Sequence, residues 1–337
     1  MNKLYPLKFN PIYKEKIWGG QNLKTFLNKN IPKNKPIGES WEISGIENEN
    51  SIVNNGFLEE NELNELIEIY MGDLIGDRVY DRFGCQFPLL IKFIDANKDL
   101  SIQVHPNNKI AQERHNDSGK TEMWYIINSQ KESKLVSGFN REINKTDYLN
   151  HVKQNELINI LNFEKAKAGD VFYIPAGQVH SIGEGILLAE IQQTSDITYR
   201  IFDWNRQDQN GNLRELHTEN AIDALDYSTK NNGKTEYTIN KNSSSKILKS
   251  PFFETNIISF DKCIELDYNN LDSFVIFMCI TGELELEYYE SEKIKLTQGE
   301  TILIPAVIEY LKLNPVTPSK LLEIYIPEPD EKRKNKK

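Results

Sequence analysis

Short runs rich in isoleucine, valine, leucine and aromatic residues recur along the chain, and Gly, Pro, Asn and Asp separate them. This pattern is typical of the strands of an all-β sandwich or barrel. The predicted strands include residues 89–94, 123–127, 171–174, 185–191, 274–278 and 301–304. We therefore expect a fold dominated by β-structure.

Helical spacing of apolar residues is confined to a few segments. Residues 61–77 and 146–163 repeat leucine, isoleucine and valine at intervals of three and four positions, and residues 216–225 form a third candidate. These intervals place the apolar side chains on one face of a helix. We expect these helices to be insertions between strands.

An internal repeat connects two distant parts of the chain. Residues 169–176 (GDVFYIPA) are echoed by residues 299–306 (GETILIPA), and both copies read as a turn glycine, an acidic residue, a short strand and a terminating proline. Each copy predicts a β-barrel module. The polar segment 229–249 is the natural linker, although part of it could pair as a strand. We expect a metal-binding domain at 1–240, with helical insertions, and a β domain without metal ligands at 241–337.

The net charge and the cysteines limit which partners and which cellular compartment we expect for the protein. The 337 residues carry a net charge of −10, and no basic stripe interleaved with aromatic residues is present, so we expect no nucleic-acid partner. The three cysteines form no CxxC motif, and no run of 18 apolar residues occurs, which favours a reduced cytoplasmic protein without a membrane span. The charged C-terminal residues 329–337 are expected to be solvated.

A candidate metal site begins at residues 101–108 (SIQVHPNN). In a strand, Gln103 and His105 would point to one face while Ile102 and Val104 point to the other. A single strand histidine is usually a hydrogen-bonded structural residue, so this segment alone does not decide for a metal.

Two further segments supply ligand types. The first copy of the repeat continues to His180, whereas the second has Tyr310 at the same place, and Glu122 lies in a third predicted strand. Two imidazoles, a carboxylate and an amide oxygen favour zinc over calcium, and three firm ligands leave a position open for water or substrate. Lys120 lies two residues before Glu122, so its amine would face the same side. It could bind an anion or move a proton.

Several segments together resemble one enzyme family. The chain contains PIGESWEIS at 36–44, FPLLIKFIDA at 87–96, GKTEMWYI at 119–126, YIPAGQVHSI at 173–182 and AEIQQTSDITYRIFDW at 189–204. The glycine-to-histidine turn resembles the second cupin motif, and the whole set resembles type I mannose-6-phosphate isomerases of the short bacterial form. The resemblance implies cupin barrels, or jelly rolls, in tandem.

The resemblance also implies a reaction and a set of residue roles. His105, Glu122 and His180 would bind one zinc ion per chain, with Gln103 as a further ligand. Arg200 would be catalytic, and Lys120 and Glu190 would line the sugar site. Interconversion of mannose 6-phosphate and fructose 6-phosphate moves a proton from C2 to C1 through an enediol. Glu190 or a water on the metal would take this proton.

The substrate phosphate requires local cations. Lys120, Arg200 and Arg206 are the nearest candidates along the sequence. An ion pair of Arg200 with Asp203 or Asp196 is the structural alternative to its catalytic role.

Two other protein classes remain possible from the residues alone. A non-catalytic sugar-binding or regulatory cupin could keep the barrel, since one scaffold hosts many functions. An iron-dependent oxygenase could use two histidines and a carboxylate. The presence of Lys120, Glu190 and Arg200 together with the ligands favours the isomerase. A monomer and a homodimer are both compatible with the sequence.

Overall fold

The computed structural model describes residues 3–207, 211–229 and 233–329. Strands dominate it, as predicted, and the chain divides into two compact units. The histidine unit, which contains all the histidines, comprises residues 12–41 and 89–235, and the C-terminal unit comprises residues 1–11, 42–88 and 236–337. The predicted domain boundary at residue 240 stays a prediction. The predicted solvated tail lies outside the described residues except for Pro329.

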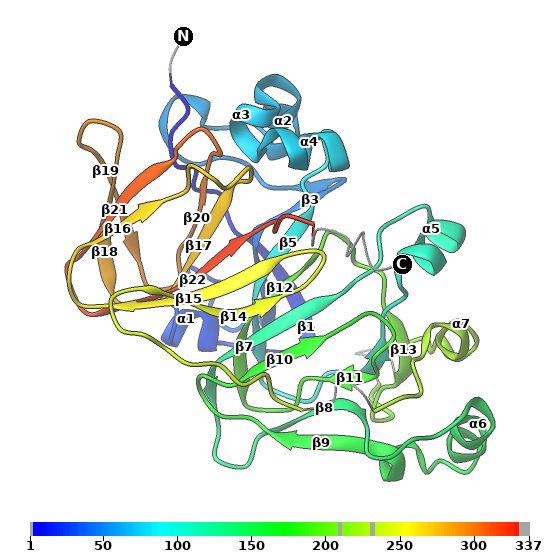
Figure 1. Ribbon diagram of the computed structural model, residues 1–337. Coiled ribbons are helices and arrows are strands. Elements are labelled where there is room, and N and C mark those ends of the chain that lie inside the picture. Colours follow the sequence, from blue (N-terminus) through cyan, green and yellow to red (C-terminus); the bar gives the residue numbers. More distant parts are fainter. Residues whose placement is uncertain (1–2, 208–210, 230–232, 330–337) are drawn as a thin grey trace, which may run out of the picture. The chain divides into compact units, whose positions relative to one another are not determined.

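Two sheets build the histidine unit (Figure 1). The first has the order β1 (Ile12–Gly20), β2 (Ile37–Ile43), β5 (Leu89–Ala96), β12 (Ile186–Gln193), β7 (Glu122–Ser129) and β10 (Val171–Ile174). The second has the order β13 (Tyr199–Phe202), β6 (Ile102–Val104), β11 (His180–Ser181), β8 (Lys134–Phe139) and β9 (Leu161–Lys165). Leu135 of the second sheet shares a buried cluster with Trp124 and Leu188 of the first. The two sheets therefore enclose a common interior.

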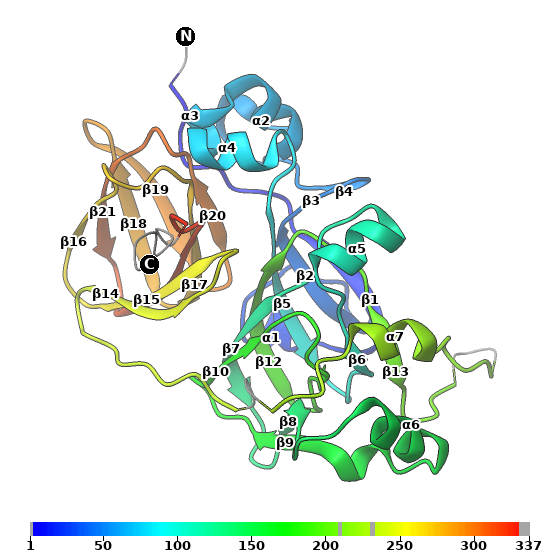
Figure 2. The ribbon, with the colours of Figure 1, turned by 45° about the vertical axis from the view of Figure 1, so that its right-hand side comes forward.

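Short helices connect these strands. They are α1 (Asn22–Thr25), α5 (Asn108–His115), α6 (Lys145–Lys153), η2 (Leu157–Ile160) and α7 (Thr218–Ala224). The last confirms the helix expected at 216–225, and it lies beside β13 in Figures 1 and 2. None of the helices in the described ranges has the length and apolar character needed to cross a bilayer.

The continuous helix predicted at 146–163 is wrong. Helix α6 ends at Lys153, and Asn155 adopts a left-handed conformation with φ 58°. The chain then forms η2 and enters β9, where Ile160 and Leu161 join the buried cluster of the second sheet. Packing of these apolar side chains against the sheet overrides the helical spacing.

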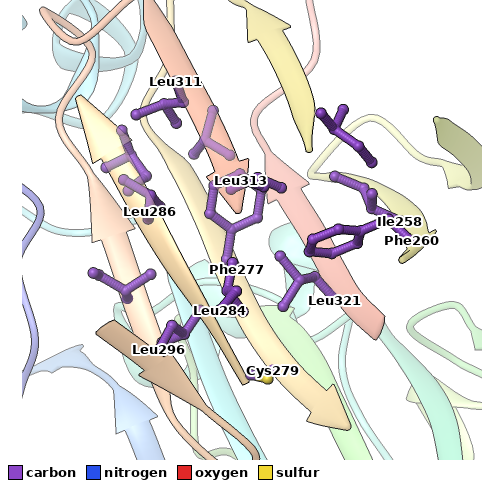
Figure 3. Close-up of a cluster of buried hydrophobic side chains, with 14 of the residues drawn as sticks. Ile258, Phe260, Phe277, Cys279, Leu284, Leu286, Leu296, Leu311, Leu313 and Leu321 are labelled. Carbon is purple, nitrogen blue, oxygen red and sulfur yellow. The ribbon is translucent and has the colours of Figure 1, made fainter. Parts of the chain in front are cut away.

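Two further sheets build the C-terminal unit. The first has the order β14 (Ser244–Lys249), β15 (Glu254–Phe260), β22 (Ser319–Tyr325), β17 (Val275–Thr281) and β20 (Thr301–Ile304). The second has the order β16 (Ile264–Asp267), β21 (Tyr310–Pro315), β18 (Glu283–Tyr288) and β19 (Glu292–Thr297), and β3 (Gly45–Ile46) pairs with β4 (Glu49–Asn50). Phe277 and Leu321 of the first sheet meet Leu286 and Leu313 of the second in one core (Figure 3). Strand β14 lies within the segment that was predicted to be a linker.

The single helix predicted at 61–77 is also wrong, because the structure has two short helices there and a third begins at Asp77. Besides η1 (Gly56–Leu58), the C-terminal unit contains α2 (Leu63–Tyr70), α3 (Gly72–Ile75) and α4 (Asp77–Phe83), grouped together in Figure 2. Met71 and Gly76 break the run with φ values of 46° and 92°. The carbonyls of Leu74 and Ile75 accept hydrogen bonds from Ala306 and Phe274. These tertiary hydrogen bonds hold the chain in separate turns.

The internal repeat has the same strand pairing in both units. In the histidine unit, Ile174 of β10 pairs with Glu122 of β7. In the C-terminal unit, Ile304 of β20 pairs with Val275 of β17. Ile174 and Ile304 are the equivalent isoleucines of the two repeat copies. Val275 therefore occupies the position that corresponds to Glu122.

Candidate active site and metal centre

Three buried side chains converge inside the histidine unit. His105 follows β6, Glu122 begins β7 and His180 begins β11. The Nε2 atoms of the histidines lie 3.1 Å apart, and each lies 3.4 Å from a different carboxylate oxygen of Glu122. All three side chains are 1% exposed. Three segments that are distant in sequence thus bring three possible ligand side chains together.

Backbone carbonyls determine which nitrogen of each histidine carries the hydrogen. Nδ1 of His105 lies 2.8 Å from the Ile197 carbonyl oxygen, and Nδ1 of His180 lies 2.8 Å from the Gln178 carbonyl oxygen. Because a carbonyl only accepts, both Nδ1 atoms are the donors. Burial lowers the pKa of both imidazoles, for His105 with added repulsion from the Lys120 ammonium. Neutral rings of this tautomer direct their Nε2 lone pairs toward each other.

This donor set fits a cation. Two lone pairs that face each other gain nothing from a direct contact, and both oxygens of the Glu122 carboxylate are buried without a hydrogen-bond partner in the described structure. A divalent metal would satisfy all of these atoms at once. The hydrogen bonds from the Nδ1 atoms to carbonyls are also those that orient metal-binding histidines. His105, Glu122 and His180 could therefore bind a metal ion.

Gln103 lies beside this group. Its Nε2 is 3.3 Å from Nε2 of His180, and its Oε1 accepts a hydrogen bond of 3.2 Å from Ser101. Ile102 and Val104 point into a hydrophobic cluster, as the alternation predicted. Rotation of the amide would bring its oxygen toward the other ligand atoms. The role of Gln103 as a ligand stays a prediction.

His105, Glu122 and His180 are called the metal group below. A cavity of about 270 Å³ adjoins this group, and Gln103 and His180 contribute to its wall. Lys120, Glu190 and Arg200 line the same cavity, so the structure brings the predicted catalytic arginine together with the two residues expected to line the sugar site. Lys120 is buried, and its Nζ lies 3.7 Å from Oε2 of Glu122.

A buried lysine in this cavity was missed at the sequence level. Nζ of Lys92 lies 3.4 Å from Oε1 of Glu190 and 3.6 Å from Oε2 of Glu39. Each carboxylate also accepts an indole hydrogen bond, Glu190 from Trp124 at 2.9 Å and Glu39 from Trp41 at 2.6 Å. The sequence did carry a signal for this lysine, because it is the one charged residue in the apolar run 89–94. A lysine buried in such a strand requires acidic partners.

Glu39, Lys92 and Glu190 lie close together, and the charge of each shifts the pKa of its neighbours. Burial alone would raise the pKa of Glu39, but the ammonium groups of Lys92 and Lys16 and the Trp41 hydrogen bond outweigh it and lower the pKa to about 2. Burial opposes the charge of Lys92, yet the two carboxylates raise its pKa. Burial and the neighbouring Glu122 raise the pKa of Glu190.

Arg200 is half-buried and reaches the cavity from β13. Its Nη1 donates a hydrogen bond of 2.8 Å to the Glu215 carbonyl, while its Nε is buried without a partner in the described structure. Burial lowers its pKa, and the charge of Arg214 adds to this effect. Asp203 pairs with Arg206 and Arg214 instead of Arg200. The structure therefore does not form the ion pair of Arg200 with Asp203.

Comparison with known proteins identifies the family. Residues 6–132 match the family model for the catalytic domain of phosphomannose isomerase type I. The chain is 32% identical over 305 residues to a mannose-6-phosphate isomerase of Streptococcus mutans, a match that covers 90% of this chain and 93% of the relative. The chain belongs to the type I phosphomannose isomerase family.

Other members of this family agree in sequence and in structure. The mannose-6-phosphate isomerase ManA of Bacillus subtilis is 43% identical over 225 residues, which cover 66% of this chain and 68% of ManA. A crystal structure of the mannose 6-phosphate isomerase from Bacillus subtilis superposes with a TM-score of 0.85 at 30% identity, covering 95% of this chain and 99% of that chain. The predicted cupin fold and the predicted isomerase class are confirmed.

Membership in this family also distinguishes the isomerase from the two other protein classes that the residues alone had left possible. A non-catalytic sugar-binding cupin and an iron-dependent oxygenase share the scaffold but not the near full-length similarity to isomerases. Both alternatives are thereby disfavoured.

Proposed function

We propose that the chain is a zinc-dependent isomerase that interconverts mannose 6-phosphate and fructose 6-phosphate through an enediol. The observation that carries this proposal is the meeting of His105, Glu122 and His180 beside the cavity that holds Lys120, Glu190 and Arg200. Two imidazoles and a carboxylate favour zinc among divalent ions.

The metal would be held by His105, Glu122 and His180, with Gln103 as a fourth ligand, one ion per chain. A divalent ion held there would supply Lewis-acid polarisation of the substrate oxygens. Ligands buried in a rigid two-sheet interior keep the geometry of such a site constant.

The proton transfer would use Glu190. A carboxylate in the cavity can take the proton from C2 of the open-chain sugar and return it at C1. Lys92 and Trp124 each hold one oxygen of Glu190, and they therefore fix its direction toward the cavity. Exclusion of water by the buried surroundings prevents loss of the proton to solvent.

The negative charge of the enediolate, which forms as the C2 proton leaves and precedes the neutral enediol, would be stabilised by Lys120 and Arg200. Both cations line the cavity, and Nε of Arg200 is without a hydrogen-bond partner in the described structure. Preorganised cations in a desolvated site stabilise such charge strongly. A net charge of −10 does not prevent the binding of a sugar phosphate, because the local field decides. A cytoplasmic location, and a monomeric or homodimeric state, stay predictions.

A coupled assay of mannose 6-phosphate conversion tests the proposal. The protein is measured as purified, after removal of metal with a chelator, and after addition of zinc. We expect activity to disappear with the chelator and to return with zinc. Folded, zinc-loaded protein without turnover would refute the reaction, and recovery with iron but not with zinc would refute the metal assignment.

A further inference from the structure

Asp203 binds two arginines of the histidine unit, and only one of them reaches the active-site cavity. Arg206 pairs with Oδ1 of Asp203 and also donates to the Asp99 carbonyl. Arg214 donates from Nε to Oδ2 at 2.6 Å and from Nη2 to Oδ1. Within the described residues, the lining of the cavity includes Arg214 but not Arg206.

The fork that Arg214 forms with Asp203 leaves one donor group available. Nε and Nη2 are engaged, whereas Nη1 makes no hydrogen bond in the part of the chain that the structure describes. Asp203 is 5% exposed, and its two hydrogen bonds with Arg214 hold this guanidinium in a fixed direction. An arginine held in this way can donate to an anion at little cost in side-chain entropy.

Each lysine among the described lining residues of the cavity is close to a carboxylate. Lys92 lies between Glu39 and Glu190, Lys16 is 3.2 Å from Glu39, and Lys120 is 3.7 Å from Glu122.

The arginines are less compensated. Arg200 makes no ion pair in the described structure, and Arg214 shares the single carboxylate of Asp203 with Arg206. Asp196 is the one further acidic residue among the described lining residues. The arginine side of the cavity thus keeps an excess of positive charge that suits a dianionic group.

We propose that Arg214 binds the phosphate group of the substrate and determines the preference for a phosphorylated sugar, with Asp203 positioning its guanidinium. This inference rests on the proposed function, because it assumes a sugar phosphate in the same cavity. It also replaces Arg206, which sequence reasoning had offered as a phosphate ligand. A guanidinium held by a carboxylate presents its remaining N–H donors in a fixed plane, and the flexible ammonium of a lysine does not reproduce this arrangement.

Two matched substitutions separate phosphate binding from support of the Asp203 network. Arg214→Gln and Arg206→Gln each remove one partner of Asp203, but only the first removes a donor from the cavity. For Arg214→Gln we expect the KM for mannose 6-phosphate and the Kd for inorganic phosphate, measured by calorimetry, to rise roughly tenfold or more. Arg206→Gln should leave both within about twofold, and Arg214→Lys should recover part of the loss.

The outcomes distinguish this inference from the proposed function. Phosphate binding by Arg214→Gln equal to that of wild type, or an equal loss in Arg206→Gln, would overturn the role of Arg214. Absence of turnover in the zinc-loaded wild type would refute the proposed function instead, and the calorimetric comparison would still decide whether Arg214 binds phosphate. Equal thermal unfolding of the variants establishes that each retains its fold.

Discussion

His105 and His180 are held in one tautomer by the carbonyls of Ile197 and Gln178, so their Nε2 atoms can serve only as acceptors. We expect His105→Asn to lose the retained metal and the activity, because the remaining ligands cannot close the site. Metal analysis after gel filtration measures this. His115→Asn is the matched control, since His115 bonds Tyr199 outside the metal group. Metal retention by His105→Asn would contradict the ligand assignment.

Glu39 couples stability to pH. Its pKa is about 2 in the folded protein against 4.5 without the interactions, so its ionised form stabilises the fold above pH 4.5 and this contribution is lost as the pH falls toward 2. Relative to Glu39→Gln, the wild type should gain at most about 3 kcal/mol in free energy of unfolding at neutral pH.

Denaturant unfolding of both proteins across this pH range measures the effect. The difference between them should shrink as the pH decreases below 4.5. A difference that stays constant down to low pH would show that Glu39 titrates normally in the fold.

The residues proposed as ligands could be picked out from the sequence because their patterns are local. The alternation around Gln103 and His105 and the repeat that ends in His180 both appear in the sequence. The partners of Lys92 were not predictable, since Glu39 and Glu190 are supplied by other strands of the same sheet. Arg214 was missed because it lies outside the segments that carry the family resemblance, the last of which ends at residue 204.

At the scale of elements, the helical segment 63–83 depends on the glycine that ends α3. Gly76 has φ 92°, and an added Cβ would lie 2.7 Å from the backbone of Asp272. Gly76→Ala should lower the free energy of unfolding by roughly 1–3 kcal/mol or more, from strain and this clash.

Gly84→Ala is the control for backbone strain alone. Gly84 also has a positive φ, of 61°, but an added Cβ would have no neighbour within 4 Å. Denaturant unfolding should therefore show a smaller loss, on the order of 1 kcal/mol. Equal losses in both variants would show that the contact with Asp272 costs nothing.

The two barrels share a strand register but not a site. Glu190 lies opposite Lys92 on the neighbouring strand of the histidine unit. At the corresponding place in the C-terminal unit, Glu323 lies opposite Asn256. The position of His180 is taken by Tyr310, which is largely exposed. Conserved pairing therefore maintains the sheet while the chemistry at the same points differs.

For the whole molecule, metal binding should stabilise the histidine unit. A ligand that binds only the folded state adds about 2.7 kcal/mol at a concentration of 100 times its Kd. We expect zinc to slow hydrogen exchange in β6, β7 and β11, which carry or directly precede the proposed ligands. Strands β17 and β20, with the same pairing in the other unit, are the internal reference. Protection that appears equally in both sets, or in neither, would contradict a metal site confined to the histidine unit.

The sequence by itself determined the β-dominated architecture, the repeated module, and the residue types of the metal group. Alternation, turn residues and the repeat are local, and they specify which face each side chain takes. Only the tertiary structure decided that α2, α3 and α4 are separate, that Lys92 lies between two carboxylates, and that Asp203 binds Arg206 and Arg214. These features depend on which strands and loops become neighbours, and that choice is made by the register of long-range pairing and by the packing of the cores.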